Sequence, residues 1–123
     1  MTIYLAGKIT GNQNYKEDFE AAERALTEAG ESVMNPAILP LGWGYDSYIE
    51  ITLAMLGECD VICLLPNWTD SPGARRELMN ALVRGKRAMK YSDFTQHGMR
   101  LLSKEDALSL LVTAYARAEG IEK

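Results

Sequence analysis

The sequence predicts an α/β domain in which a parallel sheet of four to five strands is covered by helices on both faces. Short apolar segments alternate along the chain with longer segments of helical periodicity, an order typical of a parallel sheet. One short segment, "DVICLLP" at residues 60–66, is apolar at nearly every position, as a central parallel strand buried on both faces should be. Both observations favour a sheet that lies between two layers of helices.

The first half of the chain contains two predicted strands and one helix. "TIYLA" at residues 2–6 is short, apolar and followed by a glycine, so it predicts a buried strand. Residues 14–30 predict a helix that ends at Gly30. The apolar positions at helical spacing are Phe19, Ala22, Leu26 and Ala29. "SVMN" at residues 32–35 predicts a second strand, and the prolines and glycines after it predict an irregular loop.

The middle of the chain predicts a second helix and a third strand. Asp46 or Ser47 is the expected N-cap of a helix that runs to about Gly57, and the strand at residues 60–66 follows it. The positions expected to face inward are Tyr48, Ile51, Met55 and Leu56. The apolar character of this helix is high enough that we expect it to cover one face of the sheet.

Two more helices and a strand complete the prediction. One helix begins at Ser71 and stops near Gly85, and "KRAMKY" at residues 86–91 predicts a fourth strand. Residues 92–102 give no clear prediction. The last helix covers residues 103–120, with Ser103 as its cap.

Composition limits the classes of function. The 123 residues, 47% hydrophobic and 24% charged, suit one domain spanning residues 1–123. A net charge of −4 argues against a nucleic-acid partner. No signal peptide and no apolar run of about 18 residues is found, so we expect a cytoplasmic protein without a membrane partner. The residues expected to form a solvated basic helix face are Arg75, Arg76, Arg84, Lys86 and Arg87.

The two cysteines indicate neither a disulfide nor a metal site. A strand would hold the Cα atoms of Cys59 and Cys63 too far apart for a disulfide. Together with the lone His97, which we expect at the surface, they are too few for a zinc site. We therefore expect both cysteines to be small buried residues, and we expect no metal and no other cofactor.

The predicted topology places a ligand site between the first and third strands. Doubly wound sheets bind ligands outside the carboxyl ends of their strands, where the winding order reverses. If the first strand is central, that point lies between strands one and three. The loops that meet there are "GKITG" at residues 7–11 and "NWTDSPG" at residues 67–73.

The helix after the second loop carries a carboxylate in an unusual place. Ser71 is a suitable N-cap and Pro72 suits the first helical position, so the free N–H groups of this helix favour an anion in the cleft. On a helical wheel Glu77 flanks the buried stripe instead of the outer face, so we expect it to face the cleft. The alternative is an ion pair with one of three cations, Arg76, Arg84 or Lys8.

Other side chains near the cleft allow two interpretations each. Asp70 is either a catalytic acid or a helix cap, while capping is the simplest role for Asp46 and solvation for Glu50. Glu58 and Asp60 precede their strand at the opposite end of the sheet, so we expect them to be structural or solvated. The loop aromatics, which either pack in the core or stack on a flat partner such as a nucleobase, are Trp43, Tyr45 and Trp68.

Four motifs in order resemble the nucleoside 2-deoxyribosyltransferase-like superfamily, in particular its short bacterial and phage branch. They are "YLAGKITG", "NPA", "CDVICLLP" and S-x-G-x-x-x-E, and they cover roughly residues 2–90. The resemblance implies a flavodoxin-like, doubly wound fold. It also implies that a glutamate attacks the anomeric carbon of a deoxyribose and forms a covalent glycosyl-enzyme, which water or a second base resolves.

The resemblance also implies roles for residues of this chain. The glutamate of the family is matched by Glu77 and its tyrosine in strand one by Tyr4, and Asp70 is the third catalytic candidate. In nucleotide-hydrolysing members the strand-one loop and the S-x-G turn hold a 5′-phosphate. With Asn35 of the "NPA" motif and Trp68 added, the expected substrate-binding residues are Gly7, Lys8, Ile9, Thr10, Asn35, Trp68, Ser71 and Gly73.

Two positions depart from the family pattern. Thr52 stands where the better-known members have an aspartate that helps the base leave or orients the sugar. Either Glu50, Asp46 or Asp70 takes over that task, or the activity has changed or been lost. Lys8 stands where a small polar residue is common, and a cation there favours a phosphorylated ligand.

The sequence therefore predicts cleavage or exchange of the N-glycosidic bond of a nucleoside or nucleotide through a glycosyl-Glu77 intermediate, with Glu77 kept ionised by the helix N-terminus. The alternative is a catalytically silent nucleotide-binding module that senses or sequesters its ligand, and a third reading is an assembly domain that binds a peptide. We also expect a homodimer or higher homo-oligomer, because the second helix has more apolar surface than a small sheet can cover. The resemblance adds that relatives complete their sites with a neighbouring subunit.

Overall fold

The structure, a computed structural model that describes residues 1–120, contains one sheet of four parallel strands in the order β2-β1-β3-β4. The strands are β1 (Thr2–Ala6), β2 (Ser32–Met34), β3 (Val61–Leu64) and β4 (Arg87–Lys90). β1 is central, with Tyr4 beside Met34 of β2 on one side and Ile62 of β3 on the other. The predicted fold class and the predicted reversal of winding between β1 and β3 are confirmed.

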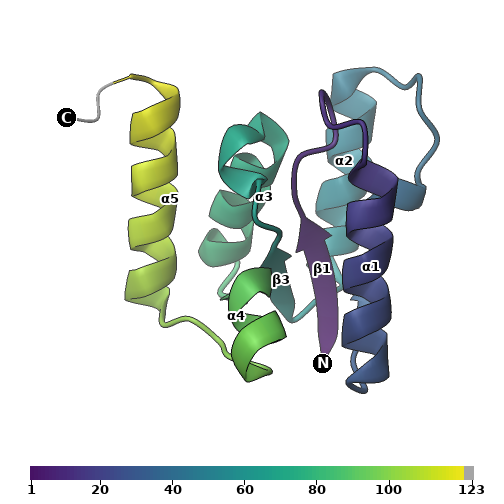
Figure 1. The fold of residues 1–123 in the computed structure, drawn as a ribbon. Helices are drawn as coiled ribbons and strands as arrows, with labels where there is room; N and C mark the ends of the chain where they lie inside the picture. The colour runs from purple at the N-terminus through teal and green to yellow at the C-terminus, as the bar shows by residue number, and fades with distance from the viewer. Residues whose placement is uncertain (121–123) are drawn as a thin grey trace.

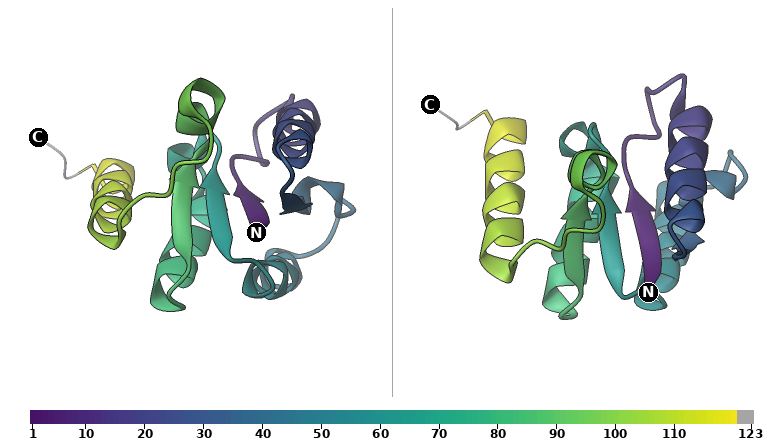
Figure 2. Two further views of the ribbon diagram at one scale, coloured as in Figure 1. Left: turned by 90° about the horizontal axis from the view of Figure 1, so that it is seen from below. Right: turned by 60° about the horizontal axis from the view of Figure 1, so that its bottom comes forward.

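Five α-helices surround the sheet (Figure 1). They are α1 (Tyr15–Glu28), α2 (Tyr45–Gly57), α3 (Pro72–Val83), α4 (Tyr91–His97) and α5 (Lys104–Ala118), with two short 3₁₀ turns, η1 (Pro36–Ile38) and η2 (Trp68–Asp70). Figure 2 shows α1 and α4 on one side of the sheet, α2 and α3 on the other, and α5 at the β4 end. α5 packs mainly on α3.

The alternation of side chains along the strands divides the core into two layers. In β1, Ile3 and Leu5 pack with Phe19 and Leu26 of α1 on one face. Tyr4 and Ala6 of β1 face the layer formed by α2, α3 and α5. All four residues of β3 are buried, which confirms the prediction of a central strand that is apolar on both faces.

The start and the buried face of α2 differ from the sequence prediction. The helix begins at Tyr45 with Gly44 as its N-cap, so neither Asp46 nor Ser47 caps it. Its buried residues are Ile49, Thr52 and Leu56, whereas Ile51 is 37% exposed and Tyr48 and Met55 are only partly buried. Apolar side chains occur on nearly every side of this helix, so the hydrophobic pattern alone does not define which face is buried.

Three smaller differences concern segments near helix ends. The loop predicted to be irregular contains η1, because Asn35 caps the turn by accepting a hydrogen bond from the N–H of Ala37. α4 lies in and just before the segment that gave no prediction. α1 ends at Glu28, and Ala29 is an exposed C-cap although it lies at helical spacing.

Of the five basic residues expected to form a solvated face, Arg76, Arg84 and Arg87 are exposed, and all except Arg76 donate hydrogen bonds to backbone carbonyl groups. The guanidinium of Arg75 donates to the carbonyl of Thr69 at 2.7 Å, and the Lys86 ammonium donates to the carbonyl of Cys59 at 2.6 Å. Arg84 and Arg87 donate to the carbonyls of Leu53 and Leu102, and the Arg76 guanidinium lies 5.7 Å from the ring centroid of Tyr45. The Lys86 ammonium also donates to the carbonyl of Gly57 at the end of α2, where carbonyl groups lack intrahelical partners.

Several large apolar side chains remain exposed on the described surface. Those before and within α2 are Ile38, Leu41, Trp43, Tyr45 and Ile51, and those on α3 and α5 are Met79, Val83, Leu108 and Val112. Such surface is compatible with self-association, and the homo-oligomer stays a prediction. Within residues 1–120, no helix is both long and apolar enough to cross a membrane.

Candidate functional site

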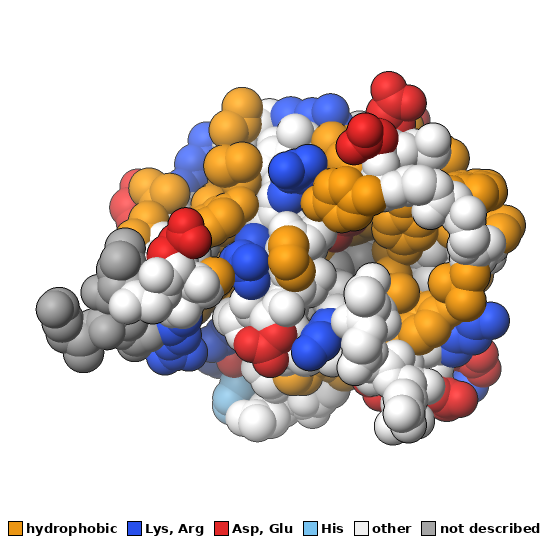
Figure 3. All heavy atoms as spheres, turned by 90° about the horizontal axis from the view of Figure 1, so that it is seen from above, with side chains coloured by type: hydrophobic (Ala, Val, Ile, Leu, Met, Phe, Trp, Pro, Cys, Tyr) orange, Lys and Arg blue, Asp and Glu red, His pale blue; other side chains and the backbone are white. Residues whose placement is uncertain are grey.

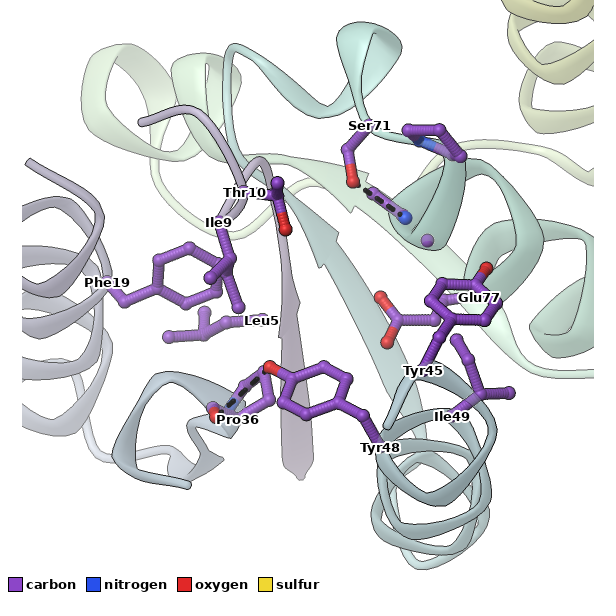
Figure 4. A pocket seen from close by; sticks show the side chains of 14 residues that line it. Leu5, Ile9, Thr10, Phe19, Pro36, Tyr45, Tyr48, Ile49, Ser71 and Glu77 are labelled. Carbon is purple, nitrogen blue, oxygen red and sulfur yellow. Dashed lines mark hydrogen bonds between the residues drawn. The ribbon is translucent and has the colours of Figure 1, made fainter. Parts of the chain in front are cut away.

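A cavity of about 320 Å³ opens at the carboxyl edge of the sheet, between β1 and α3. Viewed onto this edge, the surface is hollowed and hydrophobic side chains gather around the hollow (Figure 3). The lining residues, most of which Figure 4 labels, are Leu5, Gly7, Ile9, Thr10, Phe19, Pro36, Tyr45, Tyr48, Ile49, Ser71, Pro72, Gly73, Ala74 and Glu77. The cavity therefore lies at the predicted crevice between the first and third strands.

The two predicted loops meet here through backbone contacts. The backbone N–H of Lys8 donates to the side-chain oxygen of Asn67 at 3.1 Å. A Cβ atom at Gly7 would lie only 3.0 Å from Leu65 side-chain atoms, so a larger residue at this position would require Leu65 to shift. The glycine that follows β1 thus brings the strand-one loop against the strand-three loop.

The N-terminus of α3 opens into the same cavity. Ser71 is its N-cap, as predicted, and the Ser71 hydroxyl accepts a hydrogen bond from the N–H of Ala74 at 3.1 Å (Figure 4). Pro72 has no N–H, and Gly73 lines the cavity beside it. The positive end of the helix dipole and the hydroxyl of Thr10 across the cavity together favour an anionic group at this end.

Glu77 is the buried carboxylate of the cavity wall. It is 6% exposed, and the Tyr4 hydroxyl donates a 2.6 Å hydrogen bond to its Oε2. No lysine or arginine of the described chain forms an ion pair with it, so the alternative of an anchoring ion pair finds no support within residues 1–120. A carboxylate held by one tyrosine hydroxyl and open to a cavity is available to a ligand.

Burial raises the pKa of Glu77 to about 7, against the opposing effect of the hydroxyls of Tyr4 and Thr52. The expectation that the helix N-terminus keeps this carboxylate fully ionised is therefore wrong. Glu77 lies beyond the first turn of α3, where the helix dipole is weak, and desolvation is the larger effect. Near neutral pH the residue is divided between its acid and carboxylate forms.

This raised pKa makes the stability of the protein depend on pH. The folded-state pKa lies above the ordinary value of 4.5, so ionisation of Glu77 costs the fold almost nothing below pH 4.5 and costs most above pH 7. We expect the free energy of unfolding of Glu77→Gln, relative to that of the native protein, to rise by about 3 kcal/mol between pH 4 and pH 8. Urea unfolding of both proteins at these two pH values measures the change, and a pH-independent difference would contradict it.

Thr52, which stands at the departure from the family pattern, is fully buried behind Glu77 and Tyr4. Its hydroxyl donates to the carbonyl of Ile49 at 3.2 Å and does not line the cavity. It favours the charged form of Glu77, although it cannot ionise. The effect of Thr52 on Glu77 is therefore that of a polar hydroxyl that lowers the pKa of the carboxyl group.

The structure brings together only part of the predicted site. The predicted residues that line the cavity are Gly7, Ile9, Thr10, Ser71, Gly73 and Glu77, and Tyr4 contacts Glu77 from beneath. Lys8 belongs to the same loop but is absent from the lining. Asn35 is buried, caps η1 and donates to Glu23 at 2.9 Å. Trp68 is 5% exposed and packs in the core.

The other predicted carboxylates lie outside the cavity. Asp70 is exposed in η2, and it does not cap α3 because Ser71 does. Asp46 and Glu50 are exposed on α2. At the opposite end of the sheet, Asp60 accepts a hydrogen bond from the N–H of Thr2 at 2.9 Å, in agreement with a structural role. Glu77 is thus the one carboxylate among the described lining residues.

Sequence reasoning missed most of the apolar wall and one tyrosine. Tyr45 was predicted only as a loop aromatic, and the other lining residues not predicted as ligand contacts are Leu5, Phe19, Pro36, Tyr48, Ile49, Pro72 and Ala74. A signal for Tyr48 exists: it lies one turn before Thr52, at the end of α2 that approaches the carboxyl edge. Both cysteines are free and buried. No group of metal-ligating side chains occurs within residues 1–120.

Comparison with known proteins gives a family and a fold. No curated protein matches the chain. A solved structure titled as a 2-deoxyribosyltransferase from the psychrotolerant bacterium Bacillus psychrosaccharolyticus matches with a TM-score of 0.59 and 21% identity, over 73% of this chain and 71% of that one. At that identity the match establishes the fold. Residues 1–90 match the family model described as a domain of unknown function, so the chain belongs to the DUF4406 family.

Proposed function

We propose that the protein cleaves or exchanges the N-glycosidic bond of a nucleoside or nucleotide, with Glu77 as the nucleophile. The observation that carries the proposal is the carboxylate of Glu77, buried in the cavity wall, free of ion pairs within the described chain and held by Tyr4 at 2.6 Å. The likeness of fold to a 2-deoxyribosyltransferase supports the same class of reaction. We further propose that residues 1–123 act as one domain.

The proposed reaction has two steps. An oxygen of Glu77 forms a bond to the anomeric carbon while the bond from that carbon to the base nitrogen breaks, and the electron pair leaves with the base. Water or a second base then attacks the anomeric carbon and releases Glu77. Tyr4 keeps the carboxylate oriented and favours its charged form, which is the nucleophilic one.

The two ends of the cavity suit the two ends of a nucleotide. One wall is apolar and includes Leu5, Ile9 and Phe19, as a flat base requires. The opposite end contains the start of α3 with Ser71 and the Thr10 hydroxyl, which favour a phosphate. Figure 4 shows the Glu77 carboxylate facing the cavity from the side opposite Leu5 and Phe19, and we propose that the sugar of a bound nucleotide lies against it.

Chromatography of a mixed panel tests this function. Nucleosides, 2′-deoxynucleosides and their 5′-monophosphates are incubated with the protein, with and without an acceptor base. We expect free base to appear, and a new nucleoside to appear only if transfer occurs. A panel that remains intact at pH 8, where Glu77 is ionised, would contradict the proposal.

Removal of the Thr10 hydroxyl tests the phosphate end. Thr10→Val keeps the shape of the side chain and removes one hydrogen-bond donor to a charged ligand, which is worth about 1.5–3 kcal/mol. We expect a 5′-monophosphate to lose roughly ten-fold or more in affinity, and the matching nucleoside to change little. Titration calorimetry measures both, with Thr27→Val on the outer side of α1 as the matched control. Equal losses for the two ligands would show that Thr10 does not contact the phosphate.

A silent nucleotide-binding module is the second candidate, and one observation favours it. Glu77 is the only carboxylate among the described lining residues, so no second acid is in place to help the base leave. Such a module would be stabilised by nucleotides in thermal unfolding and would release no base. The catalytic proposal expects both stabilisation and release.

A further inference from the structure

The apolar wall of the cavity has one polar group that the proposed chemistry has not yet used, the hydroxyl of Tyr48. Among the described lining residues, the side chains with polar atoms are Thr10, Ser71, Glu77, Tyr45 and Tyr48. Thr10 and Ser71 belong to the end of the cavity at α3. Tyr45 is 53% exposed and its ring stacks on Arg76 at the surface. Figure 4 shows the Tyr48 hydroxyl on the side of Leu5 and Pro36, where the base is proposed to bind.

The hydrogen-bonding capacity of this hydroxyl is poorly used. Tyr48 donates to the carbonyl of Pro36 at 3.5 Å, which is longer than a good O–H···O bond by more than half an ångström. Close by, the hydroxyl of Tyr15 is buried and has no partner among the described residues, and it is near enough to raise the pKa of Tyr48. Tyr48 lines the cavity and its hydroxyl makes only this long hydrogen bond within residues 1–120, so it is free to donate a better one to a ligand bound there.

We propose that Tyr48 donates a hydrogen bond to the leaving base. The inference rests on the proposed function. When the bond from the anomeric carbon to the base nitrogen breaks, its electron pair stays on the base, and a donor at the base edge stabilises the negative charge that develops there. The proton remains on Tyr48 and water later protonates the released base. Tyr48 thus supplies the assistance that a second carboxylate would otherwise give.

The electrostatics of Tyr48 suit a donor that stays protonated. Burial and the neighbouring carboxylate of Glu77 raise the pKa of Tyr48 to about 12. Three titratable groups interact with Tyr48: the carboxyl group of Glu77 from α3, and the hydroxyls of Tyr15 from α1 and Tyr4 from β1. Between about pH 7 and pH 11 Glu77 is therefore mostly ionised while the phenol stays mostly neutral and can donate.

The test compares two leaving groups on the same variant. The substrates are the best nucleoside of the native protein and the same nucleoside with an activated base, carrying an N7-methyl group on a purine or a 5-fluoro group on a pyrimidine. An activated base leaves with less help. We expect Tyr48→Phe to slow release of the natural base about 10- to 100-fold, and that of the activated base less than three-fold. Because both rates come from one preparation, any loss of folded protein cancels in their ratio.

Two further variants make the outcome decisive. Tyr91→Phe, at the start of α4 and away from this cavity, is the matched control and should leave both rates unchanged. Equal losses for both substrates, or no loss, in Tyr48→Phe would overturn the role of Tyr48. Two outcomes distinguish this failure from that of the proposed function. A native protein that releases no base from either substrate overturns the function, and a Glu77→Gln protein that still turns over the activated substrate overturns Glu77 as the nucleophile.

Discussion

Glu77→Gln is expected to lower base release by about 10³-fold or more while nucleotide binding survives. Glutamine keeps the size of the side chain and can still accept the hydrogen bond from Tyr4, but it has no charged oxygen to attack the anomeric carbon. Removal of a covalent nucleophile in other enzymes costs losses of this order or greater. Single-turnover rates at pH 8, with binding measured separately by calorimetry, give the two quantities.

A control variant separates this effect from a general change of charge. Glu20→Gln, on the exposed side of α1, removes one carboxylate that pairs with Arg24 and lies far from the cavity. It should leave base release unchanged. If Glu77→Gln kept most of its turnover, Glu77 would have a structural role and the nucleophile would have to be sought elsewhere.

Tyr4→Phe is expected to shift the pH dependence of the reaction and not to abolish it. In the native protein base release should rise through about pH 7, because burial places the pKa of Glu77 there and only the carboxylate attacks. Loss of the Tyr4 hydrogen bond to this charged group costs about 1.5–3 kcal/mol, or about one to two pKa units. The midpoint should move up by that amount, and activity at pH 7, where the native carboxylate is about half ionised, should fall roughly 5- to 50-fold.

The recovery of activity at high pH is the distinctive part of this prediction. A Tyr4→Phe protein that has merely lost packing would be slow at every pH, whereas one with a raised Glu77 pKa approaches the native rate near pH 9. A profile of rate against pH from 5 to 9.5 distinguishes the two. An unshifted midpoint would show that Tyr4 does not control the ionisation of Glu77.

The sequence was informative where local chemistry has few solutions. The bounds of β1, the cap formed by Ser71 and the reversal of winding beside β3 were predicted because apolar runs, capping residues and crossover rules each allow one outcome. Those features sufficed to locate the cavity and to place Glu77 in its wall. The predicted strand order was therefore enough to predict which edge of the sheet contains the cavity.

The remaining features depend on packing between distant segments. The pKa of Glu77 is set by burial beneath α2 and by Tyr4, neither of which a helical wheel contains. The sequence allowed Trp68 to pack in the core or to stack on a flat ligand, and the fold places it in the core. The apolar pattern of α2 runs around the helix, so the pattern alone does not distinguish the side chains that line the cavity, such as Tyr48, from exposed ones such as Ile51.

Covalent trapping tests the central claim most directly. A 2-fluoro-2-deoxyribosyl nucleoside slows the hydrolysis of a glycosyl-enzyme more than its formation, so the sugar should accumulate on the nucleophile. After digestion, mass spectrometry is expected to find the added sugar on the peptide that contains Glu77, and no adduct on the Glu77→Gln protein. An adduct on a different carboxylate, or base release from the analogue with no adduct on any residue, would contradict Glu77 as the nucleophile.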